Sequence, residues 1–408
     1  MRIAFLVDTF PVLSETFILN QMTGLIDLGH EITIVSAARP EGQMVHEDVQ
    51  KYDLVSKTFY HNEPQNKYVR AGLFIILFFI FFYRNPKAFL NSINVFKYGR
   101  EATSLNYFYK VLLFSRLGGF DIIQCHYGHN GNLAAVLKEL GIPGKVVTMF
   151  HGYDIRRAID SGGKTYGPLI KNADAILAIS DHNFKYLAQF GFDPAKIISH
   201  PVGIDLKRYR LKDNGAVRPL TNPIRIITVC RLVKEKGIAF GLQTIAKLVY
   251  EHRIENIEYQ IVGEGPLREE LEQLVATLKI KAYVRFLGPQ LQTDVFSLLS
   301  KAHIFFLPSI AEVLPVVLME AHAVGLPIVA TRVGSVDQIV KDKQSGYLVA
   351  SQDVDSMTER LKFLLEHHEE WPVMGKSGRA IVEKNFDVSV LNKRLENIYR
   401  DLCSKGNK

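Results

Sequence analysis

The feature that most constrains the fold is an alternation of short apolar runs with helix-length amphipathic stretches along most of the 408 residues. The first apolar run, Arg2 to Val7, precedes a helical pattern that ends at Gly29, and a second run follows from Glu31 to Val35. Strands that alternate with helices form parallel sheets, because the chain must cross back before it can start a neighbouring parallel strand. The sequence therefore predicts an α/β fold.

The alternation occurs twice, which predicts two Rossmann-like, doubly wound domains. Between the two series, residues 206–223 are polar and basic and contain Asn, Gly and Pro, which is typical of a connector. We expect a first domain over 1–205, a linker over 206–223 and a second domain over 224–375. The last residues, 376–408, have a helical pattern that is compatible with crossing back onto the first domain. Strand-like runs begin at Asp121, Val146 and Asp174 in the first half and at Ile224, Glu258, Val284, Ile304, Leu326 and Gly346 in the second.

Composition excludes several classes of protein. With 47% hydrophobic and 22% charged residues, the chain is neither disordered nor collagen-like nor a multi-spanning membrane protein. Its three cysteines, Cys125, Cys230 and Cys403, are far apart, so neither a disulfide framework nor a CxxC zinc motif is available. The first apolar run lacks the h-region and cleavage site of a signal peptide. We expect a cytoplasmic protein.

The segment from Lys51 to Phe120 breaks the alternation. Its centre, Ala71 to Tyr83, is an uncharged apolar run, shorter than the roughly 20 residues that span a bilayer as a helix. The segment carries ten basic and three acidic residues, a surplus equal to the +7 net charge of the whole chain. Basic flanks around an apolar aromatic run predict an interfacial helix on anionic lipid through residues 71–116, at the inner face of the cytoplasmic membrane. The alternative is a buried helix pair with an ordinary basic surface.

The most informative segment for chemistry runs from Pro308 to Thr331. A strand ends near Pro308, a loop carries Glu312, and Pro315 suits the first position of a helix, where a missing N–H costs nothing. Such a helix start offers N–H groups and a positive dipole to a phosphate at the carboxyl edge of a parallel sheet. Glu320 would lie about 7–8 Å further along the axis. Two carboxylates beside an anion site suit the hydroxyl groups of a sugar, whereas each alone is an ordinary helix-end or surface carboxylate.

A second motif, VCRLVKEKG over 229–237, places Arg231 and Lys236 around a turn after a strand. Arginine grips phosphate oxygens in a bidentate way and lysine supplies a point charge, as a departing nucleoside diphosphate requires. The alternative is a pair of solvated basic residues.

Two weaker signals accompany this motif. Gly263 lies in the segment VGEGP, which lacks the full GxGxxG pattern. Its glycines are explained by a tight turn between a strand and a helix. His151 and Asp154 follow a strand of the first half and are suited to contact hydroxyl groups, although an isolated histidine is more often an ordinary loop residue.

We expect no metal site. Cys125, His126 and His129 lie at the end of one strand with no second cluster of ligands. Asp353 and Asp355 spell a DxD motif, but they precede a helix, where carboxylates are favoured by the helix dipole.

These motifs together resemble the retaining family-4 glycosyltransferases of GT-B fold. The pair Glu312 and Glu320, with seven residues between them, is similar to the signature of that family. RLVKEKG, VGEGPL, VRFLG and SGYLV occur around it in the family's order, so that the resemblance covers essentially the whole chain. The start, MRIAFLVDTFPVLSETFI, resembles the bacterial exopolysaccharide subgroup of colanic-acid type.

The resemblance implies two Rossmann-like domains that face a cleft, with the donor nucleotide held mainly by the C-terminal domain. Arg231 and Lys236 would bind the diphosphate and stabilise the leaving group, and Glu320 would bind the ribose. Glu312 and His151 would lie beside the donor sugar. The further positions implied are Gly263, Leu314, Pro315 and Val316 on the donor side and Thr9, Ser14, Glu15 and Asp154 on the acceptor side.

The reaction implied is transfer of a sugar from a UDP- or GDP-sugar to a saccharide or a polyprenyl-diphosphate-linked saccharide, with retention of configuration, in cell-surface or exopolysaccharide synthesis. No enzymic nucleophile stands out, which favours attack on the face from which the phosphate departs. No cofactor or metal is needed, because Arg231, Lys236 and the helix dipole supply positive charge. The chain departs from the family at Val313 and Leu314, since family members commonly have glycine after the first glutamate.

Other functions fit parts of the same pattern. A sugar-nucleotide epimerase or a phosphorylase of this architecture also needs carboxylates and a phosphate grip. A non-catalytic two-domain sugar-binding protein of periplasmic type would have a signal peptide and no use for the paired glutamates. Nucleic-acid binding would require basic residues along an exposed face, whereas the basic residues here accompany an apolar run.

Overall fold

The computed structural model describes residues 1–12, 15–40, 45–61, 63–161, 163–209 and 222–405. The chain divides into two compact units. Unit 1 consists of Met1–Pro201 with Asn392–Lys408, and unit 2 consists of Val202–Leu391. Each unit is built on one parallel sheet, so the predicted fold class of two Rossmann-like domains is confirmed.

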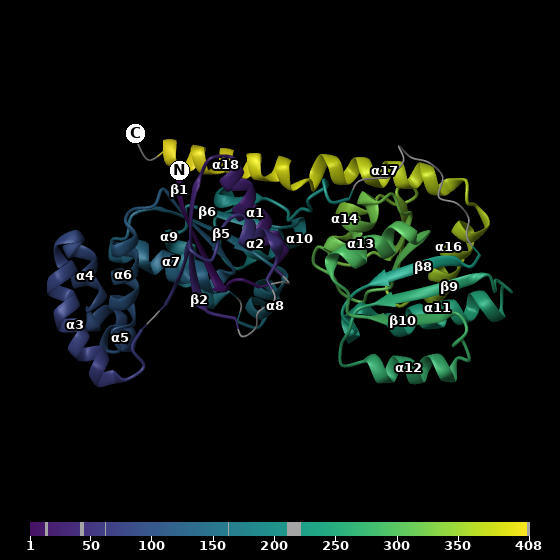
Figure 1. Ribbon diagram of the computed structural model, residues 1–408, viewed down its shortest axis with the longest axis horizontal. Helices are drawn as coiled ribbons and strands as arrows, with labels where there is room; N and C mark the ends of the chain where they lie inside the picture. Colours follow the sequence, from purple (N-terminus) through teal and green to yellow (C-terminus); the bar gives the residue numbers. More distant parts are fainter. Residues whose placement is uncertain (13–14, 41–44, 62, 162, 210–221, 406–408) are drawn as a thin grey trace. The chain divides into compact units, whose positions relative to one another are not determined.

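Unit 1 contains a seven-stranded parallel sheet in the order β3-β2-β1-β4-β5-β6-β7 (Figure 1). The interior strand β1 is buried along most of its length, and its Ile3 pairs with Ile32 on one side and Ile122 on the other. Such continuous apolar runs suit strands that helices cover on both faces. The strands are β1 (Arg2–Thr9), β2 (Glu31–Ala38), β3 (Thr58–Tyr60), β4 (Ile122–His126), β5 (Lys145–Phe150), β6 (Ala175–Ala178) and β7 (Ile197–Ser199).

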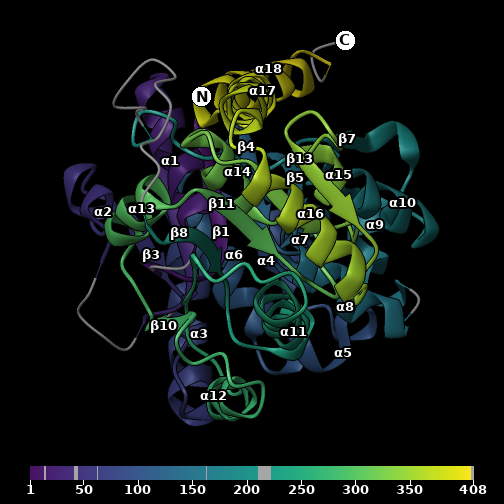
Figure 2. The same cartoon turned by 90° about the vertical axis from the view of Figure 1, so that its right-hand side faces the viewer.

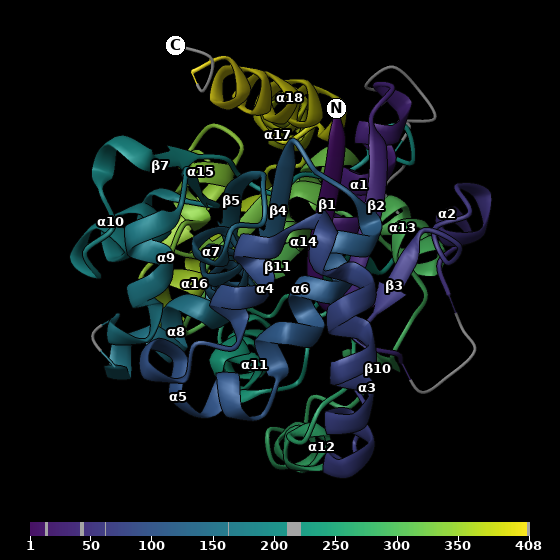
Figure 3. The ribbon, with the colours of Figure 1, turned by 90° about the vertical axis from the view of Figure 1, so that its left-hand side faces the viewer.

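The helices of unit 1 include a layered group between β3 and β4, which Figure 3 shows as α3, α4, α5 and α6. Within this group α6 is the inner helix, with Phe108, Val111 and Phe114 buried, whereas α3 has no buried residue. The segment 51–120 is therefore not a simple buried helix pair. The helices are α1 (Thr16–Asp27), α2 (Glu47–Lys51), α3 (Lys67–Phe81), η1 (Phe82–Arg84), α4 (Pro86–Ser92), α5 (Val95–Thr103), α6 (Asn106–Leu117), α7 (Gly128–Leu140), α8 (Gly152–Ser161), η2 (Lys164–Tyr166), α9 (Gly167–Asn172), α10 (Asp181–Gln189) and η3 (Pro194–Lys196).

Unit 2 contains a six-stranded parallel sheet in the order β10-β9-β8-β11-β12-β13. Figure 1 shows α13 and α14 on one face of this sheet and α11 and α12 on the other, and Figure 2 shows α16 beside α11. The strands are β8 (Ile224–Val229), β9 (Ile257–Val262), β10 (Val284–Gly288), β11 (Ile304–Leu307), β12 (Ile328–Thr331) and β13 (Gly346–Val349). The helices are η4 (Lys234–Lys236), α11 (Ile238–Tyr250), α12 (Arg268–Thr277), α13 (Gln292–Lys301), α14 (Val316–Ala323), α15 (Val336–Ile339), α16 (Val354–Glu366) and α17 (Glu370–Asn385).

The boundaries between the units differ from the expected ones. Residues 206–209, which we expected in the linker, belong to unit 2, where Leu206 and Tyr209 are buried. Residues 210–221 of the expected linker lie outside the described residues.

The C-terminal helix α18 (Val388–Ser404) contains the boundary at which the chain re-enters unit 1. The Asn392 amide donates to the carbonyl of Asn20, and the Tyr399 hydroxyl donates to the Gln124 side chain at 2.7 Å. Residues from Asn392 onward therefore pack with the N-terminal half of the chain, whereas residues 376–391 remain in unit 2.

Candidate functional site

The loops at the carboxyl ends of β8 and β11 bring Lys236 and Glu312 together in unit 2. The Lys236 Nζ lies 2.6 Å from Glu312 Oε1, and the same oxygen accepts a hydrogen bond from the Ser309 hydroxyl at 2.7 Å. The Glu312 side chain is only 6% exposed, so its charge needs these partners. The backbone joins the two loops as well, because Ile310 N donates to the carbonyl of Glu235 at 2.8 Å. A lysine held in this way presents its remaining N–H groups in a defined direction.

Arg231 lies in the same loop cluster, which we define as Arg231, Lys236 and Glu312. All three charges act on the Cys230 thiol: burial raises its pKa to about 12, Lys236 and Arg231 oppose the rise, and Glu312 adds to it. Arg231 itself is exposed. The cluster thus joins one anchored cation, one exposed cation and one carboxylate at the carboxyl edge of the sheet, where parallel α/β sheets bind ligands.

Glycines allow the loops around this cluster to approach each other closely. Gly263 has φ +129°, and a Cβ there would lie 1.9 Å from the carbonyl oxygen of Cys230. Gly334 has φ +56°, and its Cβ would lie 1.9 Å from the carbonyl oxygen of Glu312. In this structure Gly263 is a residue of close backbone packing, which is the plainer of its two expected roles.

Glu320 lies on α14 and has different partners from Glu312. Its Oε1 accepts a hydrogen bond from the Tyr209 hydroxyl at 2.7 Å. Burial raises the pKa of Glu320, and hydrogen bonds from Tyr209 and Gln292 oppose the rise. Glu320 is therefore a carboxylate that already accepts an O–H donor, which is the chemistry expected of it toward a sugar or ribose.

The helix that carries Glu320 begins one residue later than expected. Pro315 is the N-cap of α14 and not its first residue, because its ψ of 103° is extended and helical geometry starts at Val316. Leu314 is buried, so its side chain is not exposed to solvent. Of the three positions expected to bind the donor here, Val316 opens the helix and is partly buried.

In unit 1, His151 and His126 form a buried pair at the ends of β5 and β4. His126 Nδ1 lies 3.1 Å from His151 Nε2, and the Phe17 and Tyr127 rings flank His151 with centroids at 4.7 and 4.9 Å. Burial lowers the pKa of His151 to about 3. His151 is therefore a neutral imidazole at ordinary pH, suited to hydrogen bonding and not to carrying charge.

Asp154 fixes the backbone around this pair. Its two oxygens accept hydrogen bonds from the backbone N–H groups of Gly128 and His151 at 3.0 and 2.9 Å. Burial raises the pKa of Asp154 to about 6, against the effect of these two donors. Since the side chain is 2% exposed, Asp154 organises the loop and does not present its carboxylate to an acceptor as we expected.

Two polar pairs lie at the neighbouring strand ends. The Tyr127 hydroxyl donates to Glu15 Oε1 at 2.6 Å, and burial raises the pKa of Glu15. Asp8 pairs with His129, and this hydrogen bond raises the pKa of His129. Among the expected acceptor-side positions, Thr9 ends β1 beside Ala38, and Ser14 lies outside the described residues.

We define the strand-end cluster of unit 1 as His126, Tyr127, Asp8, His129 and His151. Sequence reasoning missed the first four as members of this cluster and missed Tyr209 in unit 2. The usable signal for the first four was topological: β1, β4 and β5 are neighbours in the sheet, so the residues that follow them meet at one edge. Tyr209 gave no such signal.

The residues considered for metal binding have other partners. Asp353 caps α16 by accepting from Ser356 N at 3.0 Å, and Asp355 pairs with Lys247. Within the described part of the chain, no three His, Cys, Asp or Glu residues are grouped so that they could hold a metal ion.

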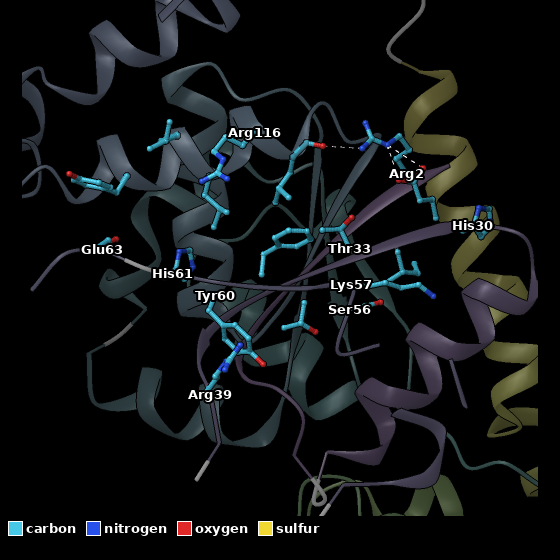
Figure 4. Close-up of a pocket in the computed structure, with 18 of the residues that line it drawn as sticks. Arg2, His30, Thr33, Arg39, Ser56, Lys57, Tyr60, His61, Glu63 and Arg116 are labelled. Atoms are coloured by element: carbon cyan, nitrogen blue, oxygen red, sulfur yellow. Dashed lines mark hydrogen bonds and ion pairs between the residues drawn. The ribbon is translucent and has the colours of Figure 1, made fainter. Parts of the chain in front are cut away.

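A cavity of about 860 Å³ lies elsewhere in unit 1 (Figure 4). It extends along β2 and β3 beneath α6 and is lined by Arg2, Thr33, Arg39, Tyr60 and Arg116 among others. No residue of the strand-end cluster lines it. We therefore place the candidate site at the strand ends and not in this cavity.

Comparison with protein families matches both halves of the chain. The family described as Glycosyltransferase Family 4 matches residues 14–208, and the family described as Glycosyl transferases group 1 matches residues 212–381. WcaL of Escherichia coli K12, provisionally named a colanic acid biosynthesis glycosyltransferase, is 31% identical over 98% of this chain and 100% of its own. The amylovoran biosynthesis glycosyltransferase AmsK of Erwinia amylovora is 30% identical over 99% and 100%.

Solved structures share the fold at low sequence identity. HepE of Anabaena in complex with UDP superposes with a TM-score of 0.72 at 16% identity, covering 98% of this chain and 100% of that one. Sucrose-phosphate synthase of Thermosynechococcus elongatus superposes with a TM-score of 0.73 at 18% identity, covering 99% and 100%.

Proposed function

The chain belongs to the group 1 and family 4 glycosyltransferases, and from this premise we propose that it transfers a sugar from a nucleoside-diphosphate donor to a saccharide or polyprenyl-diphosphate-linked saccharide in exopolysaccharide synthesis. The observation that carries the proposal is the loop cluster, in which Lys236 is anchored by Glu312 at 2.6 Å beside Arg231. Two cations at the carboxyl edge of a parallel sheet suit a diphosphate. The relatives named for colanic acid and amylovoran biosynthesis support the class of product.

In this proposal unit 2 holds the nucleotide. Arg231 and Lys236 bind the diphosphate and balance the negative charge that grows on it as the bond to the sugar breaks. Glu320 accepts a hydrogen bond from a ribose hydroxyl, as it does from the Tyr209 hydroxyl in the free protein. HepE, a neighbour in fold, is described with UDP, which supports UDP as one donor nucleotide to test alongside GDP.

We propose that the transfer retains the anomeric configuration. The bond between C1 of the sugar and the phosphate oxygen breaks, and a bond from C1 to the acceptor oxygen forms on the same face. The acceptor hydroxyl proton passes to the departing phosphate oxygen, which leaves as nucleoside diphosphate. His151 of unit 1, a neutral imidazole, is suited in this scheme to supply a hydrogen bond and not a proton. Because the cations balance the charge, the reaction requires no metal.

The test is turnover of UDP- and GDP-sugars with a polyprenyl-diphosphate-linked saccharide, in buffer with and without EDTA. We expect nucleoside diphosphate to be released only when the acceptor is present, and at the same rate with EDTA as without it. NMR of the anomeric proton should show that the anomeric carbon of the product has the donor's configuration. Lys236→Ala should lower kcat by about a hundredfold or more, as loss of a charge-stabilising group does. Lys234→Ala, which removes an exposed lysine of the same turn, should leave kcat unchanged.

Other outcomes would contradict the proposal. Conversion of the donor sugar without an acceptor would identify an epimerase, and turnover that consumes inorganic phosphate would identify a phosphorylase. A product of inverted configuration would refute the retaining step.

A further inference from the structure

The outward face of α3 carries a continuous apolar surface that the fold does not use, and we propose that it docks unit 1 on an anionic lipid bilayer. We define the docking face as Tyr68, Ile75, Ile76, Phe79 and Ile80 of α3 together with Tyr83 of the following turn η1, which are all more than half exposed. Exposed apolar surface of this extent usually marks an interaction site. The proposal concerns a surface outside both clusters described above.

The two sides of α3 have different roles. Phe74 and Phe78 face inward: the Phe74 ring lies 4.7 Å from that of Phe108, and the Phe78 ring lies 6.2 Å from that of Phe89. On the opposite side Phe79 is 77% exposed, and its ring lies 5.8 Å from that of its neighbour Phe78 on the same helix. Packing within unit 1 therefore accounts for the inward aromatic residues and leaves the outward ones unexplained.

The docking face has the geometry of a helix that lies on a membrane. Tyr68, Ile75, Phe79 and Tyr83 follow one another at spacings of seven, four and four residues, and Ile76 and Ile80 lie beside them, which places the set along one side of the helix. The 15 residues of α3 extend over about 22 Å, less than the roughly 30 Å of a bilayer core. No helix in the described ranges combines the length and the apolarity that crossing a bilayer requires. Partial insertion of one face is the mode that fits.

The charges around the stripe indicate that the surface it binds is negatively charged. The exposed Lys67 lies at its start, the exposed Arg84 and Lys87 follow its end, and the sequence contains no acidic residue between Glu63 and Glu101. Basic residues at both ends of an apolar stripe complement anionic head groups.

Tyrosines mark both ends of the stripe. Tyr68 and Tyr83 are 76% and 72% exposed, and the docking-face residues between them, Ile75, Ile76, Phe79 and Ile80, are all apolar. Tyrosine is enriched where a membrane meets water, because its ring is apolar and its hydroxyl is polar. The order of residue types along α3 thus matches the boundary of a bilayer.

A second copy of this chain is a poorer occupant of the same face. A two-fold interface places the same patch on both partners. Since both ends of the stripe are basic, each end would meet a basic end of the partner in either orientation, and like charges repel. An anionic bilayer instead complements both ends at once.

The experiment is flotation of the full chain with vesicles of phosphatidylcholine containing 30% phosphatidylglycerol, and with phosphatidylcholine alone. We expect the wild type to float with the anionic vesicles and to do so less at high salt, which screens the basic flanks. Ile75→Ser/Ile76→Ser/Phe79→Ser should lower the partition coefficient at least about tenfold, because each residue loses apolar burial.

A control variant removes three apolar side chains that are also about half exposed or more elsewhere on the chain. Val55→Ser/Val373→Ser/Val390→Ser, at positions 48–64% exposed, should float as the wild type does. Thermal unfolding of both triple variants checks that the fold is intact. The assay needs neither donor nor acceptor, so its outcome is independent of the proposed transfer.

The proposal is overturned if the wild type does not float with anionic vesicles, or if the α3 variant floats equally well. It is also overturned if light scattering shows a lipid-free dimer that the α3 variant abolishes while vesicle binding is unchanged.

Discussion

Tyr209 and Glu320 form a contact between a residue that precedes the second sheet and the helix that carries the candidate ribose ligand. The Tyr209 ring packs edge-on against Phe296 at 5.6 Å, and its backbone carbonyl accepts a hydrogen bond from Arg379 at 2.7 Å. The hydroxyl is thus held in place before it donates to Glu320. We regard Tyr209 as a positioning residue whose hydrogen bond lowers the pKa of Glu320 against the effect of burial.

Tyr209→Phe should shift the pH dependence of nucleotide binding. Burial already raises the pKa of Glu320, and loss of the Tyr209 hydrogen bond should raise it further. Binding that needs the carboxylate is present above this pKa and is lost as the pH falls through it. In a plot of nucleotide affinity against pH, the acid limb, where affinity is lost as the pH falls, should therefore move to higher pH in Tyr209→Phe. Calorimetric titration with UDP or GDP between pH 5 and 8 measures this shift.

The control is Tyr250→Phe, which removes an exposed hydroxyl bonded to the Lys279 carbonyl in the same unit. It should leave the acid limb unchanged. An unshifted limb in Tyr209→Phe would show that Tyr209 does not control the ionisation of Glu320.

The sequence predicts Arg231, Lys236, Glu312 and Glu320 as site residues because they belong to motifs at strand ends. It did not identify Tyr209, since the residue lies in a stretch that reads as a connector and reaches Glu320 across 111 positions. Contacts of this range depend on tertiary packing, which local pattern does not encode.

At the scale of elements, the loop cluster depends on backbone approaches that only glycine permits. Gly263→Ala would place a Cβ 1.9 Å from the Cys230 carbonyl at a φ of +129°. We expect Gly263→Ala to lower the free energy of unfolding by about 1–3 kcal/mol, because the backbone is strained. Denaturant titration measures this loss.

Gly72→Ala is the matched comparison. Gly72 lies inside α3, and a Cβ at this position would have no heavy atom of another residue within 4 Å beyond its chain neighbours and its own helix backbone. Alanine there should stabilise the helix by about 0.5–1 kcal/mol. Equal effects of the two substitutions would contradict the role given to Gly263.

The helix α3 shows what an apolar run predicts and what it leaves open. The run from Ala71 to Tyr83 predicts a helix too short to span a bilayer, and the structure contains such a helix. It does not separate Phe78, which packs inward, from its neighbour Phe79, which is exposed. A run without polar residues has no periodicity to reveal its inner face.

At the scale of the whole molecule, two parallel sheets followed from the alternation of strands and helices, and the family followed from the order of the motifs. The boundaries did not follow, because the start of the expected linker packs into unit 2 and the chain re-enters unit 1 only at Asn392. Helical periodicity in α17 and α18 specifies two helices and not the unit that each one covers.

The central claim is that unit 2 binds a nucleoside diphosphate through its loop cluster, and calorimetric titration of the full chain with UDP and GDP tests it most directly. Arg231→Ala and Lys234→Ala each remove one exposed positive charge near the same turn, so long-range electrostatics are matched. We expect the wild type to bind one of the two nucleotides and Arg231→Ala to weaken that binding about tenfold or more, the value of a charged hydrogen bond. Lys234→Ala should change it less than about twofold, as a screened surface charge does. No binding of either nucleotide by the wild type, or equal losses in the two variants, would contradict the claim.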